Sequence, residues 1–134
     1  MTQSKAEVMR ALVEAWNQGV REVPSEHVDA AVELESPFTS VSGQPYRGHA
    51  GIERWMQDID AHFSEWHTDL DEVHEVGDAV AGIGKLRGRG RESGVELDQA
   101  YAIVLDFERG QRITRVRIYW DLDAARGAVG LTGP

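Results

Sequence analysis

The stretch that decides the fold is residues 86–103, LRGRGRESGVELDQAYAI, in which two extended segments flank a Ser-Gly turn. Charged and uncharged side chains alternate on both sides of this turn, which is the period of a half-buried β-strand. A two-residue turn at Ser-Gly pairs Arg91 with Glu96 on one face and Leu86 with Tyr101 on the other. A one-residue slip would mix the two faces, so the sequence predicts a β-hairpin in this register.

The next turn, at residues 109–112, predicts a second hairpin with the same assignment of faces. In this hairpin Asp106 lies opposite Arg115, and Ile103 lies opposite Ile118. Both hairpins place charged residues outward and apolar residues inward, which predicts a curved antiparallel sheet with one apolar concave face. The inward residues are Leu86, Tyr101, Ile103, Leu105, Val116, Ile118 and Trp120.

Upstream of this sheet the apolar residues recur at the spacing of helices. Residues 3–18 and 48–63 each carry the stripe of a core-facing helix, and Pro24 suits the entry of a short helix over residues 24–31. From Val32 the period changes to two, which predicts a short half-buried strand. The remaining predicted elements are a bulged strand over 66–76, strands over 79–91, 95–107 and 113–120, and a last helix over 122–128 capped by Asp121.

The composition indicates one globular domain and disfavours several classes of protein. The 134 residues carry 14 Lys and Arg against 23 Asp and Glu, a formal net charge of −9, which disfavours binding to nucleic acid or to an anionic membrane. The chain has no cysteine, so disulfides, thiolate zinc sites and a cysteine nucleophile are excluded. No signal peptide or membrane span is recognisable, so residues 1–134 are expected to form a single cytoplasmic domain.

The glycines Gly82, Gly84, Gly88 and Gly90 all fall on the inward face of the strand over residues 79–91. Glycine lets a strand bend strongly and form bulges. The missing side chains would also leave an open volume inside the fold. The pattern favours curvature, and both interpretations stay open.

Several motifs around these elements resemble the nuclear transport factor 2-like superfamily, which includes SnoaL-like polyketide cyclases, ketosteroid isomerase and limonene-epoxide hydrolase. The resemblance covers nearly the whole chain. It implies an α+β fold in which a cone-shaped, curved antiparallel (mixed) sheet wraps around three N-terminal helices, with a short C-terminal helix. This fold serves many unrelated activities, so it specifies function weakly. The motifs are VELESPF at 32–38, PYRGHAGI at 45–52, GDAV at 77–80, FERGQRI at 107–113 and IYWD at 118–121.

The resemblance allows the catalytic residues of two relatives to be compared position by position. The general-base aspartate of ketosteroid isomerase aligns with Ser36, its protonated aspartic acid with Ile103, and its cavity tryptophan with Trp120. The tyrosines of its oxyanion hole align near Leu12 and with Met56. Limonene-epoxide hydrolase uses an Arg-x-Asp pair, which this sequence lacks. The resemblance therefore implies that this chain keeps the wall of the pocket but lacks the catalytic residues of both relatives.

The phasing and the resemblance together imply an apolar, aromatic-rich cavity suited to a flat hydrophobic molecule. Tyr101 either donates a hydrogen bond to a ligand carbonyl or packs against Trp120. Gln99 falls on the same inward face of the strand as Tyr101 and could orient a ligand. Any one of the apolar residues could equally serve only to fill the core. The expected ligand-binding residues are Trp16, Phe38, Trp55, Met56, Leu86, Gln99, Ile103, Val116, Ile118 and Trp120, with Leu12, Leu34 and Ile59 also in the lining.

The five histidines show no spacing of a known metal site, so neither a metal nor a cofactor is expected. Surface roles are favoured for them, and His67 is the one to test because its strand borders the cavity in the family. Arginines on the outward face of the sheet have acidic partners across the strands, so this face is expected to be solvated or to form a dimer interface.

The sequence leaves two classes of function open. The first is an enzyme of the SnoaL-like kind that isomerises, cyclises, hydrates or dehydrates a small apolar substrate, with Tyr101, Ser36 and His67 as candidate catalytic residues. The second is a non-catalytic module of the same fold that binds a small molecule or dimerises. For either class, the family implies a homodimer through the convex face of the sheet.

Overall fold

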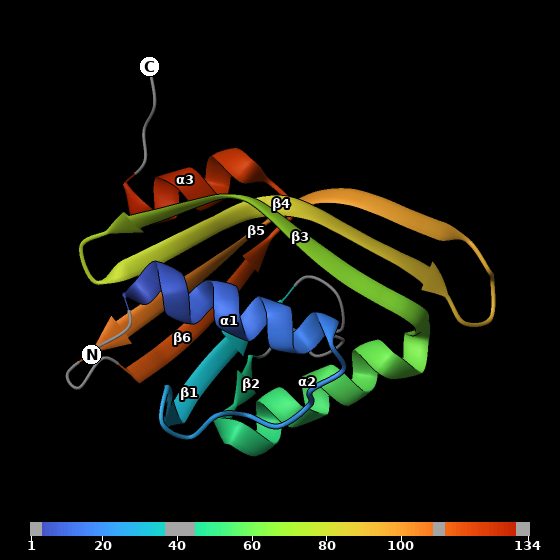
Figure 1. The fold of residues 1–134 in the computed structure, drawn as a ribbon, viewed down its shortest axis with the longest axis horizontal. Coiled ribbons are helices and arrows are strands. Elements are labelled where there is room, and N and C mark those ends of the chain that lie inside the picture. The colour runs from blue at the N-terminus through green and yellow to red at the C-terminus, as the bar shows by residue number, and fades with distance from the viewer. Residues whose placement is uncertain (1–3, 37–44, 109–111, 131–134) are drawn as a thin grey trace.

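A computed structural model describes residues 4–36, 45–108 and 112–130 of the chain. The strands form one six-stranded sheet in the order β2-β1-β6-β5-β4-β3, which is open and not closed into a barrel (Figure 1). β1 and β6 run parallel, and the other neighbouring strands run antiparallel, so the sheet is mixed as expected. In chain order the elements are α1 (Lys5–Asn17), β1 (Val28–Glu35), β2 (Tyr46–Arg47), α2 (Gly48–His62), β3 (Phe63–Val76), β4 (Ala79–Gly90), β5 (Glu96–Glu108), β6 (Arg112–Tyr119) and α3 (Leu122–Val129).

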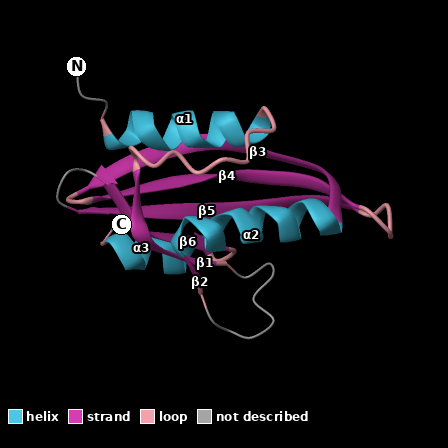
Figure 2. Ribbon diagram, turned by 90° about the horizontal axis from the view of Figure 1, so that it is seen from below, coloured by secondary structure: helices cyan, strands magenta, loops and turns pink. Residues whose placement is uncertain are grey.

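The helices lie on both faces of the sheet. α1 packs against β3 and β4, and α2 packs mainly against β1 and β2. Figure 2 shows α3 on the opposite side of the sheet from α1, where Ala125 packs with Ile83 and Ala102 in a small second core. The main hydrophobic core lies on the inner face and joins the sheet to α1 and α2. One end of the outward face is therefore covered by α3.

Most of the predicted elements are present, and local sequence explains where two of the helices begin. Ser4 and Glu7 form a capping box at the start of α1, in which the Glu7 N–H donates to Ser4 Oγ at 3.1 Å. Asp121 caps α3, as predicted, because its carboxylate accepts from the N–H groups of Asp123 and Ala124. The predicted bulge in β3 is also confirmed, by a register shift between Leu70 and Glu72.

The prediction of a short helix over residues 24–31 is wrong, so in the described part of the chain two helices, α1 and α2, precede β3. The Pro24 carbonyl accepts from the N–H groups of His27 and Val28, which makes a turn. The chain then enters β1 at Val28, and the His27 carbonyl accepts from Ile113 in β6 at 2.7 Å. Pairing with a strand distant in sequence thus overrides the local helix signal of Pro24.

The first hairpin has the predicted faces but not the predicted register. Gly90 and Val95 close a four-residue loop over 91–94, because the Gly90 N–H donates to the Val95 carbonyl and the Gly94 N–H to the Gly90 carbonyl. Every partner is therefore displaced by two residues, so that Tyr101 faces Gly84 and Leu86 faces Gln99. The predicted charge pair on Arg91 is wrong, and Arg89 pairs with Glu96 instead, at 2.8 Å. A shift of two keeps every side chain on its predicted face.

The second hairpin has the predicted register over most of its length. Asp106 lies opposite Arg115, and Ile103 lies opposite Ile118. Arg112 belongs to β6 and not to the turn, because an irregularity beside Asp106 shifts the pairing by one residue toward the end of the hairpin.

The four inward glycines of β4 serve packing and curvature and do not leave space. A Cβ at Gly84 would collide with the backbone carbonyl of Asp69 at the bulge of β3. A Cβ at Gly82 would meet Met9 Sδ at 2.7 Å and a methyl group of Leu70 at 2.9 Å. Neighbouring atoms thus already fill these positions, which excludes the open-volume interpretation here. A Cβ at Gly88 would likewise contact Glu65 and Trp66, and a Cβ at Gly90 would contact Ser93.

Within the described residues, every helix is too short or too polar to cross a membrane.

Candidate ligand-binding cavity

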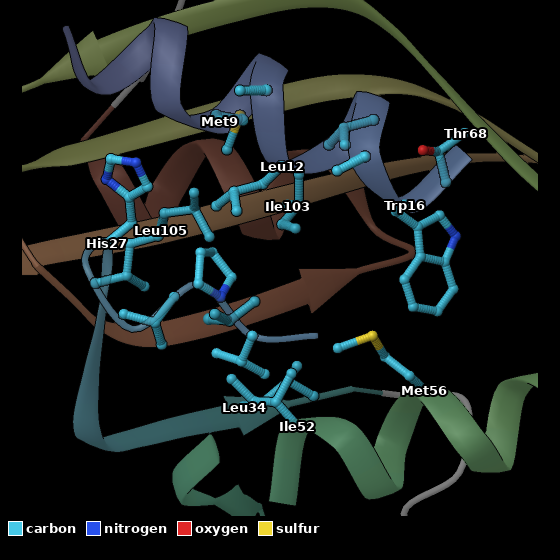
Figure 3. A pocket seen from close by; sticks show the side chains of 18 of the residues that line it. Met9, Leu12, Trp16, His27, Leu34, Ile52, Met56, Thr68, Ile103 and Leu105 are labelled. Atoms are coloured by element: carbon cyan, nitrogen blue, oxygen red, sulfur yellow. The ribbon is translucent and has the colours of Figure 1, made fainter. Parts of the chain in front are cut away.

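A cavity of about 350 Å³ lies between α1, α2 and the inner face of the sheet (Figure 3). Its remaining wall is formed by residues 20–28, which lead from α1 into the first residue of β1, and we call this segment the strap. The lining is almost entirely aliphatic and aromatic, and its volume falls in the range of small-molecule sites. From the helices and the strap it is lined by Val8, Met9, Ala11, Leu12, Val13, Ala15, Trp16, Val20, Glu22, Val23, Pro24, His27, Val28, Ile52, Trp55 and Met56. The strands contribute Leu34, Trp66, Thr68, Leu86, Tyr101, Ile103, Leu105, Ile113, Val116 and Ile118.

Trp16, Trp55 and Arg21 pack together at one end of the cavity. Helical spacing places Met9, Leu12 and Trp16 on the inner side of α1, and the Trp16 ring lies against Trp55 of α2 with centroids 5.4 Å apart. The guanidinium of Arg21 lies over the Trp16 ring at 4.1 Å, a cation–π contact. This stack joins the strap, α1 and α2 at the Trp16 end of the cavity.

Tyr101 is the buried titratable residue of the lining, with 3% of its surface exposed. Its hydroxyl oxygen finds no hydrogen-bond partner within the described part of the chain. Burial raises the pKa of Tyr101 to about 12, and the neighbouring Thr68 side chain opposes this rise without reaching hydrogen-bonding geometry. The phenol therefore stays protonated at neutral pH and can act as a hydrogen-bond donor but not as a base.

The indole nitrogens of Trp16 and Trp55 are in the same condition as the Tyr101 hydroxyl. Both Nε1 atoms are buried and have no acceptor among the described residues. Buried polar groups are normally hydrogen-bonded, so these three donors are exceptions to the usual packing, and none of the three atoms has appreciable accessible surface toward the cavity.

His27 lies at the opposite end of the cavity from Trp16 and Thr68 (Figure 3). Its backbone is held on both sides, by the Pro24 carbonyl and by the Ile113 N–H, and its imidazole has no hydrogen bond to the rest of the described chain. Histidine is the side chain that most readily gains or loses a proton near neutral pH. The strap thus presents one acid/base group to an otherwise apolar lining, with the exposed Glu22 at its rim.

Comparison with known proteins agrees with this architecture. A family model of the SnoaL-like domain matches residues 9–116, which is most of the chain. The chain belongs to the SnoaL-like family. The resemblance seen in the sequence motifs is confirmed.

Solved structures similar to this SnoaL-like chain share its fold at low sequence identity. An NTF2-like protein of unknown function from Burkholderia pseudomallei is 18% identical with a TM-score of 0.74, over 90% of this chain and 93% of that chain. A protein from Catenulispora acidiphila with a ketosteroid isomerase-like fold, in complex with trimethylamine, is 20% identical with a TM-score of 0.74, over 95% of both chains. A SnoaL-like polyketide cyclase from Agrobacterium tumefaciens is 17% identical with a TM-score of 0.73, over 96% of this chain and 100% of that chain. No curated protein matches the chain.

The SnoaL-like cavity gathers most of the residues selected from the sequence. Those in its lining are Trp16, Trp55, Met56, Leu86, Tyr101, Ile103, Val116 and Ile118.

Other selected residues lie elsewhere. Gln99 is exposed and Trp120 packs against the core outside the cavity lining. Ser36 is buried but does not contribute to the lining, and Phe38 lies outside the described residues. His67 is on the surface, where it pairs with Asp69 at 3.0 Å. The structure therefore does not bring Ser36 and His67 to the cavity that holds Tyr101.

Sequence reasoning missed the strap, whose Val20, Val23, Pro24 and His27 line the SnoaL-like cavity. In the sequence Pro24 suits the start of a helix, whereas in the structure it begins a turn, so the strap was not predicted.

No group of acidic and histidine side chains suited to a metal occurs in the described ranges. Four histidines bond to nearby groups: His49 to the Val28 carbonyl, His62 to the Asp58 carbonyl, His67 to Asp69 and His74 to Glu72. Arginines of the outward face have acidic partners, as predicted for that face.

Proposed function

We propose that this SnoaL-like chain binds a small, flat, largely apolar molecule in the cavity between α1, α2 and the sheet. The observation that carries the proposal is a cavity of about 350 Å³ whose lining is almost entirely apolar. A protein interior normally fills such a volume with side chains. An apolar ring compound would occupy the space and remove its own surface from water.

The test uses fluorene, a flat apolar ring compound, titrated by its own fluorescence. Leu12→Trp adds volume inside the lining of α1 and is expected to weaken fluorene binding at least tenfold. The matched control is Arg10→Trp, the same new side chain on an exposed position of α1. Equal binding by wild type, Leu12→Trp and Arg10→Trp would place fluorene outside the cavity and reject the proposal.

A second candidate function, acid/base catalysis on the bound molecule, is favoured by His27. In an enolisation, the C–H bond next to a ligand carbonyl breaks, its proton moves to an imidazole nitrogen of His27, and the electron pair moves to the carbonyl oxygen. Return of a proton to the same carbon then completes an exchange without net reaction.

Exchange of ring C–H protons of 2-tetralone for deuterium, followed by NMR, tests this chemistry. His27→Gln is expected to abolish exchange above the solution rate, whereas His62→Gln, an exposed histidine at the end of α2, leaves it unchanged. Exchange at the solution rate with the wild type would make the chain a binding module without this activity.

The homodimer and the cytoplasmic location stay predictions. α3 packs against β4, β5 and β6 on the convex face expected to form the dimer interface, so a partner copy would use the part of this face that α3 leaves uncovered. Sedimentation equilibrium tests the oligomeric state.

A further inference from the structure

We infer that a ligand enters and leaves the cavity between α1 and the strap, and that Arg21 controls the rate by holding the strap against Asp60 and Trp16. We call these contacts of Arg21 the latch. The inference rests on the proposed function, because it needs a molecule that binds in the cavity. It adds to that function a route of entry and a device that regulates it.

The wall formed by α1 and the strap is the part of the cavity lining that reaches the surface. Among the described residues, every exposed member of the lining belongs to this wall, namely Ala11 of α1 and Val20 and Glu22 of the strap. Every lining residue that α2, β1 and β6 contribute is buried. Val20 exposes 47% of its surface and still lines the cavity, so it lies where the cavity meets solvent. The opening of the cavity, which we call the mouth, therefore lies between α1 and the strap.

The backbone of the strap is held mainly at its two ends. At one end the Val20 N–H donates to the Ala15 carbonyl, and at the other end the Pro24 carbonyl accepts from the Val28 N–H. From residue 21 to residue 26, no backbone N–H donates to a backbone carbonyl of the described chain. Segments with few hydrogen bonds open locally at a low cost in free energy. The strap is therefore the wall of the cavity that can move while the sheet stays folded.

Arg21 is the side chain of the strap that bonds to both helices. Its guanidinium donates to the two carboxylate oxygens of Asp60 in α2 at 2.9 and 3.3 Å, and to the Trp16 carbonyl in α1 at 2.9 Å. It also lies over the Trp16 ring, 4.1 Å from the centroid. Figure 1 shows the chain passing from the end of α1 toward α2 before it enters β1. These contacts hold the strap against both helices beside the mouth, so breaking them frees the strap to move outward.

The latch is an ion pair that water and salt can reach. The side chains of Arg21 and Asp60 are 32% and 44% exposed, respectively. Ion pairs of this exposure contribute little to stability, and dissolved salt screens them. The latch therefore slows the opening of the strap without preventing it, and the strap should open faster as the ionic strength rises.

Fluorene tests the latch because it carries no charge, so ionic strength does not act on its encounter with the protein. Asp60→Asn keeps the shape of the side chain and removes its charge. The association and dissociation rates of fluorene are both expected to rise about two- to fivefold in this variant, the effect of one part-exposed ion pair. Because the opening of the strap affects entry and exit equally, the affinity should stay within about twofold of the wild type.

Salt gives a second test of the latch. Raising the NaCl concentration from about 0.05 M to about 0.5 M should speed the dissociation of fluorene from the wild type relative to Asp60→Asn, in which the charge pair with Arg21 is absent. The matched control is Asp123→Asn, which breaks an exposed ion pair with Arg126 on α3. This control should keep the wild-type rates and the wild-type response to salt.

The route is tested by obstructing the mouth. The chain has no cysteine, so Val20→Cys places a single thiol at the mouth, where N-cyclohexylmaleimide can reach it. The modified protein is expected to bind fluorene about tenfold more slowly than the unmodified Val20→Cys protein. Ser25→Cys is the matched control, because Ser25 is an exposed residue of the strap outside the cavity lining. Its modification should leave the association rate unchanged.

The outcomes separate this inference from the proposed function. Absence of fluorene binding by the wild type would reject the proposed function and this inference with it. Equal rates in the wild type and Asp60→Asn, or an equal response of the two proteins to salt, would overturn the latch and leave cavity binding intact. An unchanged association rate after modification of Val20→Cys, or equal slowing by modification of Ser25→Cys, would overturn the route.

Discussion

The side chain of Asn17 holds both backbone groups of Thr68. Asn17 Nδ2 donates to the Thr68 carbonyl at 2.7 Å, and the Thr68 N–H donates to Asn17 Oδ1 at 2.9 Å. β3 is an edge strand, and at this point the amide of Asn17 replaces the neighbouring strand that the edge lacks. One side chain therefore fixes the end of α1 to the sheet and positions Thr68 beside Tyr101.

Asn17→Ala is expected to lower the free energy of unfolding by about 1–3 kcal/mol, because two part-buried backbone groups lose their partners. Urea denaturation measures the change. Gln18→Ala is the control, since the amide of Gln18 makes only an exposed bond to Glu14 at 3.4 Å, and its effect should stay within about 0.5 kcal/mol. Equal losses in the two variants would show that the Asn17 bonds do not fix α1.

The faces of the sheet could be predicted from the sequence because they depend only on alternation. The wrong register of the first hairpin changed the partner of Tyr101 from Leu86 to Gly84 but not the face of either strand. The strap could not be predicted, because the path after Pro24 is decided by pairing between Val28 and Ile113, which are far apart in sequence.

The hydrogen bonding of the buried polar groups could not be predicted either. The sequence indicates that Trp16, Trp55 and Tyr101 face inward, but whether each polar hydrogen finds an acceptor depends on the final packing of three elements. The position of His67 could not be predicted for the same reason. Its residue type favours a catalytic role, but its side chain lies on the surface, where it pairs with Asp69.

Tyr101→Phe is expected to leave the ligand-free protein as stable as wild type or more stable by up to about 1 kcal/mol. The substitution removes a buried hydroxyl that has no partner in the described chain, so no hydrogen bond is lost. Thermal and urea unfolding measure the difference. A loss above about 1 kcal/mol would indicate that the hydroxyl is paired inside the protein, for example with Thr68.

The stability of the protein is expected to fall at high pH through Tyr101. Its pKa is raised from 10.0 to about 12 in the folded protein, mainly by burial, so the unfolded chain loses the phenolic proton first as the pH rises. The contribution of the Tyr101 proton to the free energy of unfolding is fully present below pH 10. It is lost between pH 10 and about 12, which lowers the free energy of unfolding by about 2–3 kcal/mol in total.

Urea unfolding at several pH values across this window measures the loss, and Tyr101→Phe is the control because it should remove this part of the pH dependence. An unchanged pH dependence in Tyr101→Phe would assign the loss to other groups.

Gly84→Ala and Gly127→Ala are expected to have opposite effects. A Cβ at Gly84 would collide with the Asp69 carbonyl in the bulge of β3, so Gly84→Ala should destabilise by about 3 kcal/mol or more. A Cβ at Gly127, in the helix α3, would meet no atom within 4 Å, and Gly127→Ala should stabilise by about 0.5–1 kcal/mol. Denaturant unfolding of both variants measures the pair. A Gly84→Ala protein as stable as wild type would mean that β3 can move away from β4 at the bulge.

Arg21 is expected to control how fast a ligand leaves the cavity. Its guanidinium donates to Asp60 of α2 at 2.9 and 3.3 Å and to the Trp16 carbonyl at 2.9 Å, and it lies over the Trp16 ring. The side chain thus ties the strap to both helices beside Trp16.

Arg21→Ala should raise the dissociation rate of bound fluorene several-fold and lower stability by about 1 kcal/mol, because a part-exposed ion pair and a cation–π contact are lost. Stopped-flow displacement measures the rate, and Arg126→Ala, which breaks an exposed ion pair with Asp123 on α3, should leave it unchanged. If Arg21→Ala changes stability but not the dissociation rate, ligands leave by a path that does not require the strap to move.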